Sequence, residues 1–163
     1  MIREILLLGN PRLYEQCNEV TKDDLPEMKR VVNDLHDTLL EFRRRYGAGR
    51  AIAAPQIGVM KRLVYMYIDT PVVFINPVVK PDGDEMMEVM DDCMSFPELY
   101  VKLMRHKRIT IDSLDIEFNP QKHSFEGDLA ELLQHECDHL DGVLATMRAL
   151  DNKAFFARGY EKV

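Results

Sequence analysis

Residues 135–139 of this chain read His135-Glu136-Cys137-Asp138-His139. The apolar pattern of residues 128–140 predicts a helix, and a glycine at position 142 stands where a helix ends. Side chains four residues apart share one helix face, so both imidazoles can reach one cation. Glu136 lies beside them and can exchange protons with a water on that cation. The stretch therefore predicts a helix that carries a hydrolytic metal site.

A catalytic metal site of this kind needs a third protein ligand beside an open position. A third histidine at position 145 is excluded, because that residue is Ala145. Glu161 has roughly the spacing of a downstream glutamate ligand, but it lies in a polar tail near the end of the chain. His106, His123 and Cys93 also remain as candidates, and residue type alone does not show which of them is the third ligand.

A second long helix and several strands are expected around the first. Apolar residues spaced by three or four predict an amphipathic helix from Leu25 to Tyr46, with Gly47 at its end. A short amphipathic helix is expected over 151–160. Strands are expected at 63–68, 72–75, 78–80, 85–90, 107–118 and 121–125. This order predicts an α+β fold with antiparallel or mixed strands, in one domain over residues 1–163.

Composition and charge exclude several classes of protein. Hydrophobic residues make up 46% of the chain, enough for one core, and the net charge of −7 argues against non-specific binding to nucleic acid or to an anionic membrane. No apolar run approaches the roughly 20 residues of a membrane helix. The apolar stretch at the N-terminus is too short for a signal peptide, which predicts a cytoplasmic protein. Three cysteines suggest free thiols or a metal ligand.

Three motifs occur in order along the chain. Residues 49–56, Gly-Arg-Ala-Ile-Ala-Ala-Pro-Gln, resemble a Gly-x-Gly-x-Ala-Ala-x-Gln loop. Residues 91–95, Asp-Asp-Cys-Met-Ser, resemble Glu-Gly-Cys-x-Ser, and residues 134–142 closely match a Gln-His-Glu-x-x-His segment. Residues 9–13 resemble the opening segment of the same proteins. Together these stretches resemble the peptide deformylase family over nearly the whole chain.

The resemblance implies strands wrapped around a central metal-binding helix, and removal of the formyl group from N-formylmethionine on nascent peptides, with the ribosome as a candidate partner. It implies one divalent cation on Cys93, His135 and His139, typically Fe(II), with Zn or Ni able to replace it. Within that site Glu136 would carry protons. The Gln56 amide and the backbone N–H of Met94 would stabilise the oxyanion.

The chain departs from the family pattern in the loops expected to contact substrate: Gly49, Arg50, Ala51 and Asp91. Arg50 replaces a residue that is usually apolar, Ala51 replaces a glycine, and Asp91 and Asp92 replace Glu-Gly. Tyr100 stands in place of a family arginine, although Arg105 follows. No departure removes a ligand, the proton carrier or Gln56. A related amidase with a different acyl or amine substrate is therefore one alternative. A non-enzymatic metal-binding relative is another, which an intact Glu136 argues against.

Two carboxylates are expected beside the metal. Glu131 and Asp128 lie four and seven residues before His135, and both spacings return to the ligand-bearing helix face. The resembled family lines its methionine pocket there with apolar side chains. Because a buried carboxylate needs a partner, an Arg50–Glu131 pair is expected to make the pocket narrower or more polar. The alternative is that both acids are exposed to solvent at the start of the helix.

Overall fold

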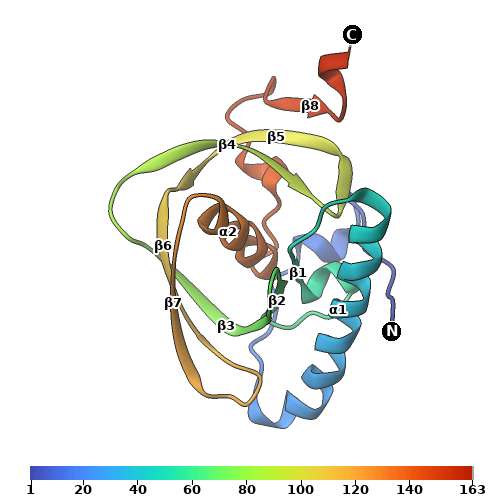
Figure 1. Cartoon of the computed structure of the whole chain (residues 1–163), viewed down its shortest axis with the longest axis vertical. Helices are drawn as coiled ribbons and strands as arrows, with labels where there is room; N and C mark the ends of the chain where they lie inside the picture. Colours follow the sequence, from blue (N-terminus) through green and yellow to red (C-terminus); the bar gives the residue numbers. More distant parts are fainter. Residues whose placement is uncertain (163) are drawn as a thin grey trace.

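Within residues 1–162, which the computed structural model describes, eight strands form two antiparallel sheets (Figure 1). The five-stranded sheet has the order β1-β2-β3-β6-β7, and the three-stranded sheet has the order β4-β5-β8. Their bounds are β1 Ala51–Ala53, β2 Leu63–Tyr67, β3 Pro71–Pro81, β4 Met86–Cys93, β5 Phe96–His106, β6 Arg108–Leu114, β7 Pro120–Glu126 and β8 Phe155–Ala157. Helices and antiparallel sheets together confirm the predicted α+β class.

Helix α2, Asp128–Leu140, lies in the middle of the molecule in Figure 1. Strands β4 and β5 pass above it, β6 and β7 lie to its left, and β3 lies below it. One face of the helix is apolar and packs against β1, β2, β3 and β6 through Ala130, Leu133, Cys137 and Leu140. The chain turns away from the helix at Gly142, which has a φ of +69°. A Cβ on this glycine would collide with the backbone carbonyl of Tyr14, so no other residue fits here.

Helix α1, Leu25–Tyr46, has the predicted bounds. Its buried face consists of Met28, Val31, Leu35, Thr38 and Leu39, which repeat at helical spacing and pack onto the β1–β3 side of the molecule. The helix ends at Gly47, which has a φ of 69° and donates its N–H to the carbonyl of Arg43 at 2.8 Å. Five short 3-10 turns complete the helical structure: η1 Pro11–Tyr14, η2 Lys22–Asp24, η3 Ala54–Ile57, η4 Ala145–Arg148 and η5 Tyr160–Lys162.

Two predicted strands, 72–75 and 78–80, are one strand. β3 runs through both, and its register against β6 shifts between Ile75 and Val78. Asn76 has a φ of 49° at this irregularity, and Pro77 follows it. The turn-like residues therefore mark a bulge in one strand rather than a break between two. The predicted hairpin between 107–118 and 121–125 is present as β6 and β7, although β6 ends at Leu114.

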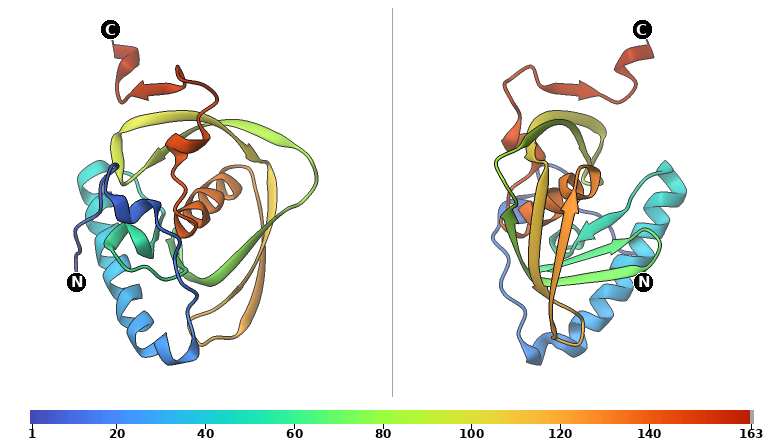
Figure 2. Two further views of the ribbon diagram at one scale, coloured as in Figure 1. Left: turned by 180° about the vertical axis from the view of Figure 1, so that it is seen from behind. Right: turned by 60° about the vertical axis from the view of Figure 1, so that its left-hand side comes forward.

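The predicted C-terminal helix over 151–160 is wrong. That segment contains β8, which pairs with β5 from Leu99↔Ala157 to Val101↔Phe155. Backbone hydrogen bonds also join the two segments on either side of the paired residues. One of them runs from the Lys102 N–H to the Ala154 carbonyl at 2.9 Å. Both views in Figure 2 show this C-terminal segment at the outer side of β4 and β5, where β8 forms the edge of the three-stranded sheet. The strand it joins, β5, was absent from the predicted elements, so the sequence offered the tail no pairing partner.

Across residues 1–162, no helix is both long enough and apolar enough to cross a bilayer.

Candidate active site

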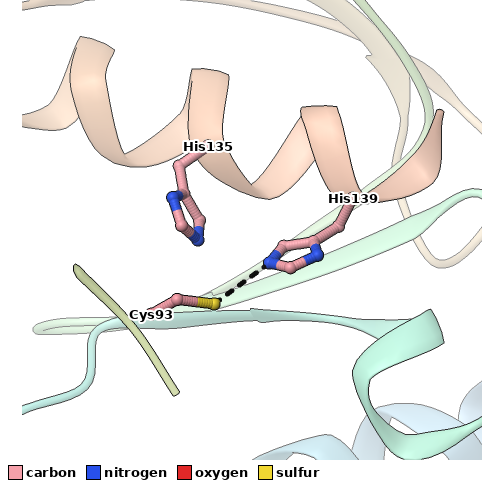
Figure 3. Close-up of side chains that lie close together, drawn as sticks. All are labelled: Cys93, His135 and His139. Atoms are coloured by element: carbon pink, nitrogen blue, oxygen red, sulfur yellow. Dashed lines mark hydrogen bonds between the residues drawn. The ribbon is translucent and has the colours of Figure 1, made fainter. Parts of the chain in front are cut away.

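Three ligand-type side chains converge between α2 and the end of β4 (Figure 3). Cys93 closes β4, while His135 and His139 lie one turn apart on α2. The Cys93 Sγ lies 3.3 Å from the Nε2 of His139, and the ligand atoms of all three residues lie within 4.8 Å of one another. All three side chains are buried. A thiol and two imidazoles in this arrangement form a donor set that fits Fe(II), Zn(II) or Ni(II).

The other candidates for the third ligand lie outside this group. Among residues 1–162, Cys93, His135 and His139 form the one cluster of at least three such groups close enough to share an ion. His106 and His123 lie at the end of β5 and in β7, and Glu161 lies in η5. Of the four alternatives that the residue types left open, Cys93 is therefore the one that the fold brings to the two histidines.

Strand β4 places Asp91 and Cys93 on the same side. Alternate residues of a strand face opposite ways, so Asp91 and Cys93 are buried while Asp92 between them is exposed. Asp91 Oδ1 lies 2.8 Å from His135 Nδ1, and Asp91 Oδ2 accepts a hydrogen bond from Arg105 at 2.8 Å. Burial raises the pKa of Asp91, but His135 and Arg105 more than offset this and hold it below its ordinary value. Asp91 therefore contacts the candidate ligand His135 and also borders a cavity beside Cys93, which is described below.

Arg105 is a site residue to which the sequence motifs gave no role. It lies on the buried face of β5 with Val101 and Leu103. Its guanidinium bridges Asp91 to Asp138 of α2, at 2.8 and 2.5 Å, and Asp138 also accepts hydrogen bonds from Arg148. The inward alternation of β5 would have located Arg105, since a buried arginine requires carboxylate partners.

Tyr100 lies away from this network. It faces β8, and the guanidinium of Arg158 lies 4.9 Å from the centre of its ring. In this chain, the position at which the family pattern has an arginine therefore contacts the C-terminal segment.

Gln56 reaches the cluster from η3. Its Oε1 accepts the N–H of Ala53 at 2.9 Å, and its Nε2 donates to Ser95 Oγ at 3.2 Å and to Cys93 Sγ at 3.5 Å. The side chain is almost fully buried. The bond to Ala53 thus fixes the amide so that its N–H₂ group faces the thiol. Met94 follows Cys93 in the turn between β4 and β5.

Glu136 is buried beside the candidate ligands. Its Oε2 atom has no hydrogen-bond partner within residues 1–162. Burial raises the pKa of Glu136 to about 7, although nearby His135 opposes this effect. A carboxyl group with a pKa near neutrality can both accept and release a proton.

A cavity of about 230 Å³ opens beside Cys93. It is bordered by the loop before β1, the end of β4, Phe42 of α1 and one face of α2: Phe42, Ala48, Gly49, Arg50, Ala51, Asp91, Asp92, Cys93, Met94, Glu131, Leu132, His135 and Glu136. Most of the predicted catalytic and substrate-binding residues are therefore brought together here. Gln56 and His139 contact Cys93 without bordering the cavity, and Asp128 is linked to it through Arg50.

The expected Arg50–Glu131 pair is wrong. Arg50 bonds both carboxylate oxygens of Asp128, from Nη1 to Oδ2 and from Nη2 to Oδ1 at 3.2 Å. Asp128 begins α2 and its side chain is 69% exposed, so the loop arginine meets it at the rim. Glu131 is half-buried one turn further in, and burial, with Asp91 and Asp128 nearby, raises its pKa to about 7.

Known proteins resemble this chain over most of its length. A profile of the polypeptide deformylase family matches residues 2–155. Peptide deformylase 1 of Prochlorococcus marinus (strain MIT 9313) is 36% identical over 166 residues, which cover 94% of this chain and 84% of that protein. The crystal structure of a Thermotoga maritima peptide deformylase matches with a TM-score of 0.84 and 31% identity, over 93% of this chain and 99% of that chain. A Synechococcus elongatus peptide deformylase, solved in complex with actinonin, matches with a TM-score of 0.84 and 27% identity, over 92% of this chain and 80% of that one.

The family match contains every residue of the candidate site, from Phe42 to His139. The similarity thus covers the fold and the cavity together, in agreement with the motif resemblance. This chain belongs to the polypeptide deformylase family, and the predicted enzyme class, an amide hydrolase that removes the formyl group from peptides, is confirmed.

Proposed function

We propose that this chain, acting as one catalytic domain, removes the formyl group of N-formylmethionyl peptides with a divalent cation held by Cys93, His135 and His139. The observation that carries this proposal is the convergence of these three side chains beside Glu136, where Cys93, His135 and Glu136 border a cavity of about 230 Å³. Nascent formylated peptides in the cytoplasm, at or near the ribosome, are the proposed substrates. Direct contact with nucleic acid is not part of the proposal.

The cation supplies a Lewis acid that polarises the formyl carbonyl and makes water a stronger nucleophile at neutral pH. Fe(II) is the proposed ion, with Zn(II) or Ni(II) able to occupy the same donor set. Asp91 orients the ring of His135 through its Nδ1 side, and Arg105 holds Asp91 in place.

Glu136 is proposed to move the protons. Its unpartnered Oε2 can accept a proton from the attacking water and later deliver it to the leaving amine. Its raised pKa suits both steps, because the group is neither a very weak base nor a very weak acid near pH 7.

Gln56 and Met94 are proposed to stabilise the negative charge that develops on the formyl oxygen. The amide of Gln56 is held by Ala53 with its N–H₂ group toward Cys93, so it needs no reorganisation to donate. The backbone N–H of Met94 is the second proposed donor.

The loop at Gly49–Ala51 is proposed to hold the peptide backbone. It leads into β1, which is an edge strand of the five-stranded sheet and pairs only with β2 among the described strands. An extended peptide can therefore add to the free edge of β1 by backbone hydrogen bonds.

A related amidase with another acyl or amine substrate is the second candidate. The charged side chains of Arg50, Asp91 and Glu131 around the cavity favour it, because an apolar methionine side chain does not need them. A non-enzymatic relative is disfavoured, since a structural metal site has no use for a buried carboxyl group such as Glu136.

The decisive experiment is formate release from formyl-Met-Ala-Ser by the Fe(II)-loaded protein under anaerobic conditions. Zn(II)- and Ni(II)-loaded samples compare the ions, and a Glu136→Gln sample with the same metal content is the control. We expect formate release in proportion to the amount of enzyme, and release lower by about 10² or more with the control. Full metal occupancy without formate from any formylated peptide would overturn the proposal.

A further inference from the structure

The charges around the cavity are unequally compensated. Arg50 and Asp128 neutralise each other at the rim. The charge of Asp91 is neutralised by Arg105, and the guanidinium of Arg105 also donates a hydrogen bond to Asp138. Asp92 also borders the cavity, but it is exposed to solvent and its carboxylate lies 3.6 Å from the guanidinium of Arg158. These groups therefore leave little net charge directed at an incoming side chain.

Glu131 is different, because its carboxylate has neither a hydrogen bond nor an ion pair among residues 1–162. It borders the cavity one helical turn before His135 and is half-buried. Arg50 is close enough to interact with its charge, but both guanidinium hydrogen bonds go to Asp128. A half-buried carboxylate without a partner costs free energy, and a ligand group that donates to it removes this cost.

The rest of the wall suits an aliphatic chain. Phe42, Ala48, Met94 and Leu132 border the same cavity and offer no side-chain charge. An entering side chain would thus contact apolar groups along its stem and meet Glu131 with a terminal group. Lysine-like side chains have this form, an aliphatic stem with a cationic end.

We propose that this cavity selects formylated substrates whose first residue carries an aliphatic side chain ending in a cationic amine, with Glu131 as its partner. This inference rests on the proposed function: formylmethionyl peptides remain substrates, and the inference concerns which first side chain the site prefers. A thioether or a plain alkyl chain would fill the apolar part but leave Glu131 without a partner. An acidic side chain would be repelled by it. Glu131 is thus a specificity-determining residue rather than a catalytic one.

A peptide series tests the inference. The metal-loaded protein is given formyl-X-Ala-Ser, in which X is lysine, Nε-acetyllysine, norleucine, methionine or glutamate. Norleucine has the stem of lysine without the amine, and acetyllysine keeps the length without the charge. We expect kcat/KM for lysine to exceed that for norleucine and acetyllysine by about tenfold or more, with glutamate lowest.

Variants connect the preference to Glu131. Glu131→Gln keeps the shape and should abolish most of the lysine-to-norleucine ratio, while Glu131→Leu should reverse it. Asp128→Asn should also lower the ratio, because it releases Arg50 to compensate Glu131. Glu88→Gln removes an exposed acid of β4 outside the cavity and should leave the ratio unchanged.

Binding of the unformylated peptides Lys-Ala-Ser and Nle-Ala-Ser to the metal-loaded protein, measured by calorimetry, gives the same ratio without turnover. The inference is overturned if norleucine equals or exceeds lysine in both measurements, or if Glu131→Gln leaves the ratio unchanged. If no peptide is hydrolysed but Lys-Ala-Ser binds more tightly through Glu131, the deformylase function fails and the side-chain preference stands.

Discussion

Asp91 and His135 face each other inside the protein, with Asp91 Oδ1 2.8 Å from His135 Nδ1. This contact occupies one ring nitrogen and leaves Nε2 as the atom available toward Cys93 and His139. Arg105 holds the other carboxylate oxygen of Asp91 at 2.8 Å, so the aspartate cannot turn away. A carboxylate behind a ligating imidazole fixes its orientation and makes it a stronger ligand.

Replacing Asp91 by asparagine should therefore weaken metal binding. The variant keeps the size of the side chain but loses the charge that faces His135 and Arg105. We expect an affinity for Zn(II) about 10- to 100-fold lower in chelator competition, together with a lower Tm. Asp92→Asn is the matched control, because Asp92 is the next residue of the same strand but is exposed and pairs with Arg158 rather than with His135 or Arg105. Equal losses in the two variants would show that the contact with His135 has no special role.

Cys93→Ala should abolish stoichiometric metal binding. It removes the sulfur from a group of three ligand atoms and leaves two imidazoles, which hold a cation much less tightly. Metal content after gel filtration is the measurement. Cys17→Ala, which removes a buried cysteine that is not part of the cluster, should retain the metal. The assignment is wrong if Cys93→Ala keeps full occupancy while His123→Ala or Glu161→Ala loses it.

Glu136→Gln should separate metal binding from turnover. Glutamine preserves the size and the hydrogen-bonding shape of the side chain but cannot accept the proton. We expect unchanged metal content and a kcat lower by about 10² or more. Near-normal turnover in a metal-replete sample would remove Glu136 from the proposed mechanism.

Long periodic segments were the predictable part of the fold. The bounds of α1 and α2 follow from apolar spacing and from the glycines at their ends. Strand β5 was not predicted because the alternation is blurred at its end, where the charged Arg105 is buried and the apolar Met104 is exposed. The arginine is accommodated by Asp91 and Asp138, which come from two other elements, so only the tertiary structure explains it.

The candidate site, like the fold, was only partly predictable from the sequence. Four-residue spacing brought His135 and His139 together, whereas Cys93 was one of several possible third ligands until the fold placed β4 beside α2. Asp128 and Glu131 lie one turn apart on nearly the same helix face, so the sequence could not decide which one meets Arg50. That choice depends on how far the loop before β1 reaches along α2.

Glu131→Gln should also stabilise the protein in a pH-dependent way. Burial raises the pKa of Glu131 from the ordinary 4.5 to about 7, so between these values the folded protein holds a proton that the unfolded chain releases. The free energy of unfolding therefore falls as the pH rises through this window, and the cost is fully present above about pH 7. Glutamine carries no charge and avoids this cost.

Thermal unfolding of both proteins, matched in metal content, should show no difference near pH 4.5 and a growing advantage for Glu131→Gln up to about pH 7. The advantage above pH 7 should be on the order of 1–3 kcal/mol, because each unit of pKa shift corresponds to about 1.4 kcal/mol and the partial exposure of Glu131 to solvent reduces the total. Glu88→Gln controls for the removal of one exposed negative charge and should follow the parent at every pH. If the stability difference between Glu131→Gln and the parent is constant with pH, or shrinks as the pH rises, then the Glu131 carboxylate has a stabilising partner in the folded protein and the prediction is wrong.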